Sequence, residues 1–466
     1  MQSYKIAEHR IFNVQGHDFL FLVSENAVFE LEPEISRILK QSNSCEKFNK
    51  KELVDLLKTM NRGAPEELAD SLARQRIIVP EIEAKADYTG AEATIPLKTL
   101  VLHVTEACNL SCVYCYRKDF AKQNKMTTRI AQKAVDFLFE HCGGLEEVVI
   151  VFFGGEPLLN FNVISFTVKY AQSKALENKK KVSFALTTNA TLLTERVVAF
   201  LHENSVSVTV SMDGLKHVHD SFRCFPDGSP SYDVILSGTK KLISTAHKKP
   251  VVARVTVAKD PKNVPETLKH LLNLGFAEAG FAPVTTHDPV YQLNNENMDL
   301  LLDRFRFLAE EFFQTSLKDR FFGFTNLIDL LVALHQGEVK NYPCGAGLGL
   351  FSVSPDGKLY ICQRFTGDDC LCMGDLFNGF DMRAIKIFRE QAELSQKKAC
   401  KTCHARVICA GGCYHEALIR ENDLKKPNLH YCKWIQGWID TGLEVYAKLI
   451  LTNPDYPEKL CLLRGH

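Results

Sequence analysis

The chain has 466 residues, of which 45% are hydrophobic and 24% are charged, as is usual for proteins that bury sizeable cores. Its 56 basic residues match its 56 acidic residues, so charge favours neither nucleic acid nor a membrane surface as a partner. No apolar run is long enough to span a bilayer and the polar start lacks a signal peptide, so we expect a cytoplasmic protein. In that reducing compartment, 16 cysteines favour metal binding over disulfides.

Residues 1–80 are predicted to form a small α+β unit. A β-hairpin is expected over residues 17–31, because two alternating apolar runs flank a polar turn at Ser24, Glu25 and Asn26. Three helices and a short strand should follow, near residues 34–41, 50–60, 65–75 and 76–79. Residues 81–96 are polar and lack periodicity, which predicts a linker.

Strands and helices are predicted to alternate through residues 97–290. Six apolar runs are expected to be strands: 100–104, 148–153, 183–187, 206–211, 251–257 and 279–284. With helices such as 127–140 and 163–178 between them, this rhythm predicts an α/β fold with a parallel sheet, either open or an incomplete barrel. Functional side chains are then expected at the carboxyl ends of the strands. A helical bridge (291–340), a cysteine-rich segment (341–450) and a tail (451–466) complete the predicted organisation.

Three cysteines follow the first core strand within eight residues: Cys108, Cys112 and Cys115. This C-x3-C-x2-C spacing can place three thiolates on one loop, and a [4Fe–4S] cluster held by three cysteines keeps one iron free for another ligand. A zinc site is the competing interpretation, but it needs a fourth cysteine or histidine close by. His103 precedes the loop on the predicted strand, and we interpret it as structural.

This cysteine loop, with Tyr114 at its aromatic position, resembles the hallmark of radical S-adenosylmethionine (radical SAM) enzymes. The resemblance implies a partial (β/α)6 barrel and a [4Fe–4S] cluster whose free iron chelates S-adenosylmethionine. One electron from the cluster then cleaves the cofactor to a 5′-deoxyadenosyl radical. The chain is therefore expected to be a radical SAM oxidoreductase.

The end of the second strand also resembles this family. Gly154, Gly155, Glu156 and Pro157 look like its element for the methionine amino group, because glycines let the backbone approach closely and a carboxylate can accept from an ammonium. Without the resemblance, this tetrapeptide would be an ordinary turn with Glu156 on the surface.

Two further strand ends continue the resemblance. Asn189 lies at the end of the third strand and is expected to contact the cofactor. Ala190 follows it where relatives often carry glycine. Ser211 is expected to contact the cofactor's ribose or carboxylate, and Asp213 to face the active site. Asp213 and Arg223 are the predicted catalytic residues. For His217 and His219, a role in ordering the site and a place on a solvated loop are both open.

Seven more cysteines form a second pattern: Cys344, Cys362, Cys400, Cys403, Cys409, Cys413 and Cys432. A Pro-Asp-Gly turn at residues 355–357 predicts a hairpin that brings Cys344 and Cys362 together. Seven thiolates can serve two clusters, whereas zinc fingers are the competing interpretation of Cys400–Cys413.

The spacing resembles the SPASM extension of radical enzymes that modify peptides. The resemblance assigns Cys400, Cys403, Cys409 and Cys432 to an outer auxiliary [4Fe–4S] cluster. It assigns Cys344, Cys362 and Cys413 to an inner cluster that lacks a fourth ligand. Either Cys370 or Cys372 supplies that ligand, or the iron stays open to a substrate cysteine. Cys45, Cys142 and Cys461 are interpreted as ordinary thiols, and Cys224 is slightly more suggestive because it follows Arg223.

The N-terminal unit resembles the winged-helix domain by which peptide maturases capture a leader peptide as an added strand. Together, the three parts resemble thioether-forming maturases of ranthipeptides, sactipeptides and quinohemoprotein amine dehydrogenase. The resemblance implies three [4Fe–4S] clusters, S-adenosylmethionine, a cysteine-containing precursor peptide, and a flavodoxin or ferredoxin as electron donor. Alternatively, the N-terminal unit is a stabilising cap.

Other functions stay open at this point. Within the class, the alternatives are a formylglycine-forming sulfatase maturase and a maturase that forms carbon–carbon crosslinks. Outside it, the chain could be an iron–sulfur electron carrier or a zinc-stabilised binding module. Neither of these would cleave S-adenosylmethionine, and the elements at residues 154–157 and 211–214 argue against both, because a carrier needs no nucleoside pocket.

Overall fold

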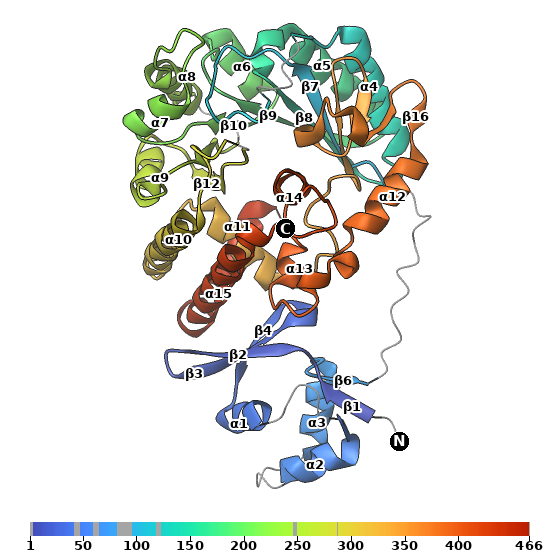
Figure 1. The fold of residues 1–466 in the computed structure, drawn as a ribbon, viewed down its shortest axis with the longest axis vertical. Coiled ribbons are helices and arrows are strands. Elements are labelled where there is room, and N and C mark those ends of the chain that lie inside the picture. The colour runs from blue at the N-terminus through green and yellow to red at the C-terminus, as the bar shows by residue number, and fades with distance from the viewer. Residues whose placement is uncertain are drawn as a thin grey trace.

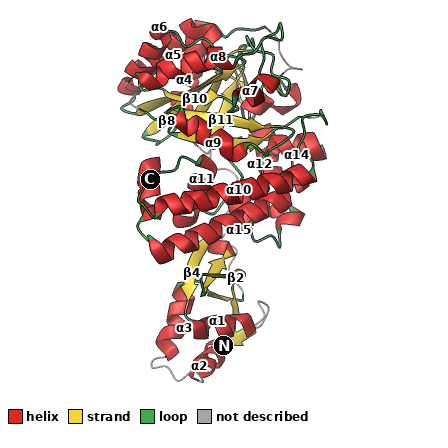
Figure 2. Ribbon diagram, turned by 90° about the vertical axis from the view of Figure 1, so that its left-hand side faces the viewer, coloured by secondary structure: helices red, strands yellow, loops and turns green. Residues whose placement is uncertain are grey.

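The structure is a computed structural model that describes residues 3–41, 47–58, 65–81, 96–117, 123–245, 249–286 and 288–465. The chain is arranged in three tiers, with the α/β core at the top of Figure 1, the C-terminal helices in the middle and the N-terminal unit at the bottom. The side view in Figure 2 shows the same order. Most of the predicted linker, at 82–95, and Cys45 lie outside the described residues.

Six parallel strands form the core, in the order in which they follow one another along the chain. They are β7 (Thr99–Thr105), β8 (Glu147–Gly154), β9 (Lys181–Thr188), β10 (Ser207–Ser211), β11 (Val252–Val257) and β12 (Glu278–Pro283). Helices connect successive strands: α4 (Thr128–His141), α5 (Phe161–Glu177), α6 (Glu195–Glu203), α7 (Lys216–Phe222), α8 (Tyr232–Ser244) and α9 (Val264–Asn273). The predicted α/β fold with a mostly parallel sheet is confirmed, and this order places all six carboxyl ends at one edge.

The sheet continues beyond the core into the cysteine-rich segment. The added strands are β13 (Leu350–Val353), β14 (Lys358–Tyr360), β15 (Cys372–Asp375) and β16 (Gly379–Phe380). β13 runs parallel to β7, with Leu350 opposite Thr99 and Val353 opposite Leu102. The hairpin predicted around residues 355–357 is present, as β13 and β14, and Gly357 takes the left-handed conformation at its turn (φ +93°). The result is one ten-stranded sheet.

Helices of the C-terminal half form the middle tier. The two longest, α10 (Asn295–Ser316) and α15 (Leu429–Thr452), pack together beside α11 (Thr325–His335) and α16 (Tyr456–Arg464) (Figure 2). Phe305 lies at their centre, with its ring edge-on to Phe324, Trp434 and Trp438. Shorter helices lie in the cysteine-rich segment: α12 (Met382–Ala392), α13 (Arg406–Cys409), which ends at Cys409, and α14 (Tyr414–Glu421), which begins directly after Cys413.

The N-terminal unit contains two small antiparallel sheets and three helices. The predicted hairpin is present as β3 (His17–Leu22) and β4 (Ala27–Leu31), and β2 (His9–Val14) pairs with β3. The helices are α1 (Pro33–Gln41), α2 (Lys50–Lys58) and α3 (Pro65–Arg74), close to the predicted ranges. The second sheet, with β1 (Ser3–Ile6) between β5 (Lys47–Asn49) and β6 (Ile78–Pro80), was not expected in full, because β1 and β5 are short and join distant segments.

The N-terminal unit is docked directly on the middle tier. Phe19 is fully buried together with Val14 and Ala447 of α15, and Phe21 and Val23 belong to the main hydrophobic core. Around this apolar contact, both guanidinium nitrogens of Arg406 bind the Glu8 carboxylate, at 2.5 and 2.7 Å. Arg406 lies between two of the outer-group cysteines, so the unit touches the cysteine-rich segment itself.

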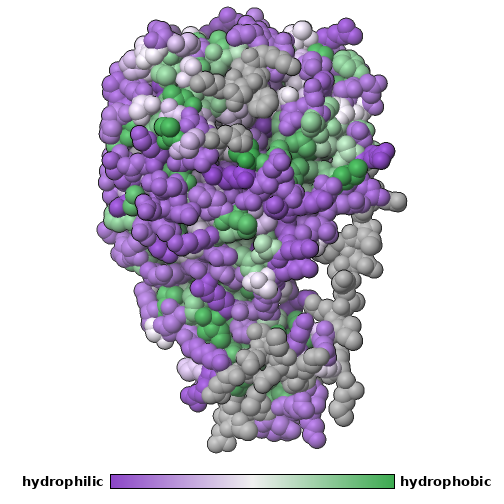
Figure 3. All heavy atoms as spheres, viewed as in Figure 1, coloured by the Kyte–Doolittle hydropathy of each residue, from purple (hydrophilic) through white to green (hydrophobic). Residues whose placement is uncertain are grey.

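Hydrophilic side chains cover most of the face shown in Figure 3, with apolar side chains scattered between them. Among the described residues, no helix combines the length and apolar character that a bilayer crossing requires.

Candidate active site

A cavity of about 580 Å³ opens at the carboxyl ends of the six core strands, within the usual range for small-molecule sites. Every core strand contributes a lining residue at its end or just beyond it. Of the residues predicted to bind the cofactor or catalyse the reaction, the lining includes Tyr114, Gly154, Gly155, Asn189, Ser211 and Arg223. The lining also includes Cys108, Cys112 and Cys115, so the predicted motifs meet in one place.

The cysteine loop is held by main-chain hydrogen bonds to the segment after α7. The amides of Ser111 and Val113 donate to the carbonyls of Cys224 and Phe222, at 2.8 and 3.0 Å. The Cys224 thiol also donates to the Ser111 carbonyl, at 3.5 Å, so both its backbone and its side chain hold the loop. These bonds fix the loop over the end of the barrel, with its three thiols turned to the cavity.

The three thiols lie close enough to influence one another. Burial, followed by smaller contributions that include the neighbouring thiols, raises the pKa of Cys108 to about 11 and that of Cys112 to about 12. Such thiols need a cation to become thiolates, and a bound iron cluster supplies one. The donor set therefore fits a cluster with three protein ligands.

Gly154 and Gly155 form a cradle beneath the loop. A Cβ atom on Gly154 would overlap the carbonyl oxygen of Thr105, and one on Gly155 would overlap that of Ala107. The Gly155 amide donates to Thr105 at 2.9 Å, and the Glu156 amide donates to Ala107 at 2.9 Å. These glycines are required because the end of β8 lies directly against the backbone that leads into Cys108.

Glu156 does not line the cavity, and neither does Pro157. The Glu156 carboxylate is fully buried, and it accepts from the Thr188 hydroxyl (2.7 Å), the Asn189 amide (2.7 Å) and the Leu158 amide (3.1 Å). Burial raises its pKa to about 7 despite these donors. Glu156 thus ties the end of β8 to the end of β9, a role that the expected contact with an ammonium did not include.

Asn189 connects the end of β9 to the cysteine loop. Its side-chain NH2 donates to Asn109 at 2.9 Å and approaches the Cys108 sulfur at 3.9 Å, while its oxygen accepts from Thr191. Ala190 adopts a left-handed backbone conformation (φ +62°). That conformation favours glycine, although alanine occupies it in this chain.

Asp213 lies behind the cavity rather than in it. Its buried carboxylate accepts from the Tyr114 hydroxyl, the Arg223 side chain (3.0 Å) and the Thr256 amide (3.0 Å). Arg223 lines the cavity, stacks over the Tyr114 ring at 5.5 Å and approaches the Cys112 sulfur at 3.9 Å. The carboxylate oxygens of Asp213 thus hold the loop, and the predicted catalytic role of Asp213 stays a prediction.

The two histidines after β10 differ. His217 is exposed, whereas His219 is fully buried and accepts from the Asp213 amide at 3.2 Å. Its other ring nitrogen is 3.1 Å from the Ser231 hydroxyl, and burial lowers its pKa to about 4. His219 is thus a neutral, structural residue beneath Asp213, and the solvated-loop interpretation applies to His217 alone.

Several cavity residues were not predicted from sequence. Thr187, Thr209, Arg254 and Thr256 line the cavity from alternate positions of β9, β10 and β11. A polar residue at every second position of a strand was the available signal, because alternate residues face the inside of a barrel. Arg364 reaches the cavity from the cysteine-rich segment and donates to Thr285 at 2.8 Å.

The four thiols of the predicted outer group are brought together. Burial, then the nearby Cys400, Cys432 and Cys403, raises the pKa of Cys409 to about 12. Burial, then Cys400 and Cys403, raises the pKa of Cys432 to about 11. A four-thiol set from three segments of chain fits a [4Fe–4S] cluster, and it also fits tetrahedral zinc.

The three thiols of the predicted inner group are also brought together. Burial raises the pKa of Cys362 to about 12, and Cys413 and Cys344 contribute in the same direction. By contrast, Cys372 pairs across the sheet with Tyr360 and its thiol donates to the Gly374 carbonyl at 3.3 Å. Cys370 is exposed on the preceding turn. The inner group therefore has three neighbouring thiols. Neither Cys370 nor Cys372 is among the main charges that shift the pKa values of Cys344 and Cys362.

A second cavity, of about 660 Å³, lies between the cysteine loop and the cysteine-rich segment. It shares Tyr114, Cys115, Tyr116 and Arg364 with the first cavity, so the two adjoin. Its outer wall includes His415 and Leu418 of α14, which begins directly after Cys413. The second cavity is not lined by the inner thiols themselves, but Arg364, which lines both cavities, interacts electrostatically with Cys413 and Cys362.

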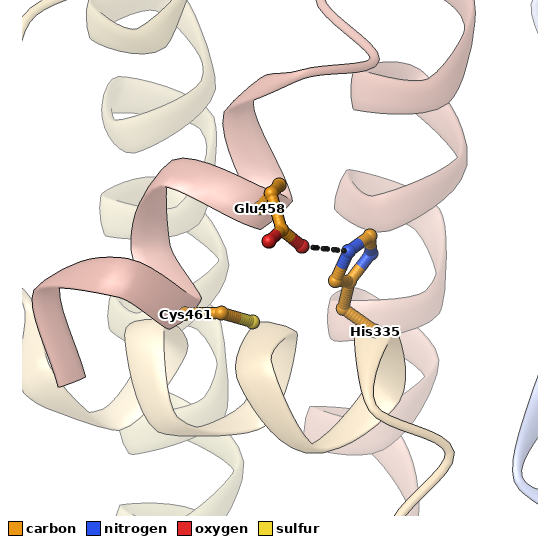
Figure 4. A group of neighbouring side chains, drawn as sticks. All are labelled: His335, Glu458 and Cys461. Carbon is orange, nitrogen blue, oxygen red and sulfur yellow. Dashed lines mark hydrogen bonds and ion pairs between the residues drawn. The ribbon is translucent and has the colours of Figure 1, made fainter. Parts of the chain in front are cut away.

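Another group of possible metal ligands lies between α11 and α16 and consists of His335, Glu458 and Cys461. Figure 4 shows the His335 ring hydrogen-bonded to the Glu458 carboxylate, with the buried Cys461 beside them. The distance between the ring nitrogen and the carboxylate oxygen is 3.1 Å. The other nitrogen of His335 is 3.0 Å from the Tyr446 hydroxyl. Both ring nitrogens are thus engaged by protein partners, and the group acts as an interhelical contact.

Comparisons with known proteins agree with this geometry. Residues 102–271 match the Radical SAM superfamily. A protein of Methanocaldococcus jannaschii is 30% identical over 280 residues, which cover 59% of this chain and 88% of that protein. A cysteine-type anaerobic sulfatase-maturating enzyme of Clostridium novyi is 24% identical, over 71% of this chain and 89% of the enzyme.

Solved structures share the fold. anSMEcpe with bound AdoMet aligns with a TM-score of 0.68 at 21% identity, over 80% of this chain and 99% of that one. Streptococcus suis SuiB bound to its precursor peptide SuiA aligns with a TM-score of 0.53 at 15% identity, over 92% of this chain and 100% of that one. These solved structures show the fold. The match of residues 102–271, which include the cysteine loop and the glycine cradle, and the 30% identical relative show that the chain belongs to the radical SAM superfamily.

Proposed function

We propose that the protein is a peptide maturase that forms thioether crosslinks between a cysteine sulfur and a carbon of another side chain. When bound, the cluster and S-adenosylmethionine supply a 5′-deoxyadenosyl radical that takes a hydrogen atom from the substrate carbon, which then bonds to sulfur with loss of one proton and one electron. Cys108, Cys112 and Cys115 hold this cluster. Gly154, Gly155, Asn189, Ser211 and Tyr114 surround the cofactor in the cavity.

The observation that carries the proposal is the inner group of three thiols, two of which interact electrostatically with Arg364 in the wall of both cavities. A cluster held by Cys344, Cys362 and Cys413 alone keeps an iron free, and a substrate thiolate is a suitable fourth ligand. The same cluster can accept the electron released when the bond forms. Arg364 and Tyr116, between the two cavities, line the path that a peptide would take.

The N-terminal unit supports a peptide substrate. It has a three-stranded antiparallel sheet with β2 and β4 at its edges, and an edge strand can pair with an extended peptide. The structure of SuiB, which aligns with most of this chain, contains a precursor peptide. We propose that a leader segment binds this unit while the modified residues reach the cavities.

A formylglycine-forming sulfatase maturase is the second candidate. The relatives include cysteine-type and serine-type anaerobic sulfatase-maturating enzymes. The serine-type enzyme of Klebsiella aerogenes is 26% identical over 68% of this chain. This candidate needs no bond between two side chains, and its product carries an aldehyde.

The test uses the anaerobically reconstituted protein, S-adenosylmethionine, a reductant and a cysteine-containing peptide encoded beside its gene. We expect a peptide lighter by two hydrogens whose cysteine no longer reacts with iodoacetamide, together with 5′-deoxyadenosine. An aldehyde that reacts with a hydrazide would instead identify the sulfatase-type reaction. A peptide with two hydrogens lost and all thiols free would identify carbon–carbon crosslinking.

A cysteine variant provides the control for the cofactor site. The triple Cys108/Cys112/Cys115→Ala variant should form no 5′-deoxyadenosine but keep its auxiliary iron. The matched control is Cys142→Ala, since Cys142 is a buried thiol outside the three groups. Cofactor cleavage by the triple variant would contradict the assigned role.

A further inference from the structure

Lys397 is a lysine buried in the cysteine-rich segment, with 1% of its surface exposed. Its ammonium donates to the carbonyl of Ala410 at 3.2 Å and lies 5.2 Å from the centre of the Tyr414 ring. Among the described residues, no carboxylate forms an ion pair with it. A buried ammonium normally needs an anionic partner, so its surroundings require an explanation.

The ionisable groups that act on the pKa of Lys397 are thiols of both auxiliary groups. Burial lowers its pKa, whereas Cys400 and Cys409 of the outer group, and Cys344 and Cys413 of the inner group, act in the opposite direction. In return, Lys397 lowers the pKa of Cys400 and of Cys344 against the effect of burial. The contacts of the ammonium agree with this, because Ala410 directly follows Cys409 of the outer group and Tyr414 directly follows Cys413 of the inner group.

Gly411 keeps this place open. A Cβ atom on Gly411 would overlap the Lys397 side chain and lie 2.5 Å from its ammonium nitrogen. The next residue, Gly412, has a similar left-handed backbone (φ +77° against +86°), but a Cβ there would meet no atom within 4 Å. A Cβ at position 411 would therefore have to displace the Lys397 side chain, whereas a Cβ at position 412 would not.

We propose that Lys397 is a positioning residue that acts as the shared counter-ion of the two auxiliary clusters and raises the reduction potentials of both. This inference rests on the proposed function, which places clusters at these thiols. Reduction adds negative charge to a cluster, and a fixed cation in a water-poor site stabilises the more negative state. Because one cation serves both clusters, their potentials move together, which favours electron passage between them.

The test is a redox titration of the reconstituted holoenzyme, followed by electron paramagnetic resonance. Lys397→Met removes the charge and keeps an unbranched side chain, and Lys397→Arg keeps the charge. In Lys397→Met we expect both auxiliary potentials to shift to more negative values, with return towards wild type in Lys397→Arg. The potential of the Cys108 cluster should not move, because its thiols are not prominent charge neighbours of Lys397.

The glycine pair gives a second test that leaves the lysine in place. Gly411→Ala should displace the ammonium and shift both potentials as Lys397→Met does. Gly412→Ala introduces the same backbone strain without the contact, and it should leave both potentials unchanged. Equal shifts in the two alanine variants would refute the role of the lysine.

Iron content separates this inference from the proposed function. Three clusters predict about twelve iron atoms per chain. Wild-type protein with about four, or with stoichiometric zinc, would overturn both proposals. Wild-type potentials in Lys397→Met protein that retains full iron would overturn only the role of Lys397. If that variant loses auxiliary iron, the comparison of Gly411→Ala with Gly412→Ala decides.

Discussion

The buried pair of Asp213 and Arg223 shows how single side chains shape this site. Asp213 receives the Tyr114 hydroxyl, the Arg223 guanidinium and a main-chain amide of β11, so three separate segments meet at one carboxylate. Burial is the largest single influence on the pKa of Arg223 and would lower it, but the charges of Asp213, Tyr114 and Cys112 and the hydrogen bond to Asp213 together outweigh burial, so the pKa is raised. The pair keeps a cation beside Cys112 and holds the aromatic residue of the loop in place.

Glu156 should give folding a characteristic pH dependence. Burial raises its pKa from the ordinary 4.5 to about 7, so between these values the folded protein keeps a proton that the unfolded chain has released. Stability is therefore expected to fall as the pH rises from about 4.5 to about 7, by on the order of 3 kcal/mol from this group. Urea unfolding of wild type and Glu156→Gln across this range measures it, and the variant should lose that slope. Parallel curves for the two proteins would show that Glu156 is ionised throughout.

The candidate thiols could be predicted from sequence because ligand spacing is local: Cys108, Cys112 and Cys115 share one loop whatever surrounds it. The orientations of Glu156 and Asp213 could not, because their partners come from β9 and β11. Lys397 carried no signal at all, since its neighbours are thiols from segments up to 53 residues away, with Cys344 the farthest.

Among the elements, the contact between β8 and β7 places the most demands on residue type. The end of β8 lies so close to the backbone before Cys108 that a methyl group does not fit at Gly155. Gly155 does not have a left-handed backbone, so this demand comes from space alone. The strand end therefore sets the position of the cysteine loop.

Gly155→Ala should move that loop. We expect lower iron content at the Cys108 cluster and weaker binding of S-adenosylmethionine, because the added Cβ must displace the backbone at Ala107. Iron analysis and calorimetry of the reconstituted protein measure both. The matched control is Gly144→Ala, where a Cβ would meet no atom within 4 Å. Normal cofactor affinity in Gly155→Ala would mean that the loop adapts freely.

Most elements could be predicted from sequence because their periodicity is strong. The six core strands begin and end within two residues of the predicted limits, and α4 spans Thr128–His141 against a predicted 127–140. The pairing of β13 with β7 had no local signal, since about 250 residues separate the two strands and neither sequence specifies its neighbour.

On the scale of the whole molecule, the N-terminal unit is joined to the rest through a shared core. Phe19 packs on Ala447 of α15, and Phe21 and Val23 belong to the main core. Removal of residues 1–80 would therefore expose apolar surface of the helices, whatever its effect on peptide binding. Point variants are the better test of this unit.

Phe19→Ala should loosen the docked unit. We expect the free energy of unfolding to fall by about 3–5 kcal/mol, because a fully buried aromatic side chain leaves a cavity. Hydrogen exchange should rise in β2, β3 and β4, while the cysteine loop keeps its protection. Phe307→Ala is the control, since 48% of the Phe307 surface is exposed. Equal losses of stability in the two variants would contradict the docking described here.

The parallel pairing of β13 with β7 limits how the two halves of the chain can be exchanged between proteins. β7 leads straight into the radical-generating loop, and its free edge is covered by a strand of the segment that carries the other thiols. A chimera that joined this barrel to a foreign tail would leave that edge bare, as a template for aggregation. The two halves must therefore be transplanted together, and substitutions that arise along this seam are constrained by both.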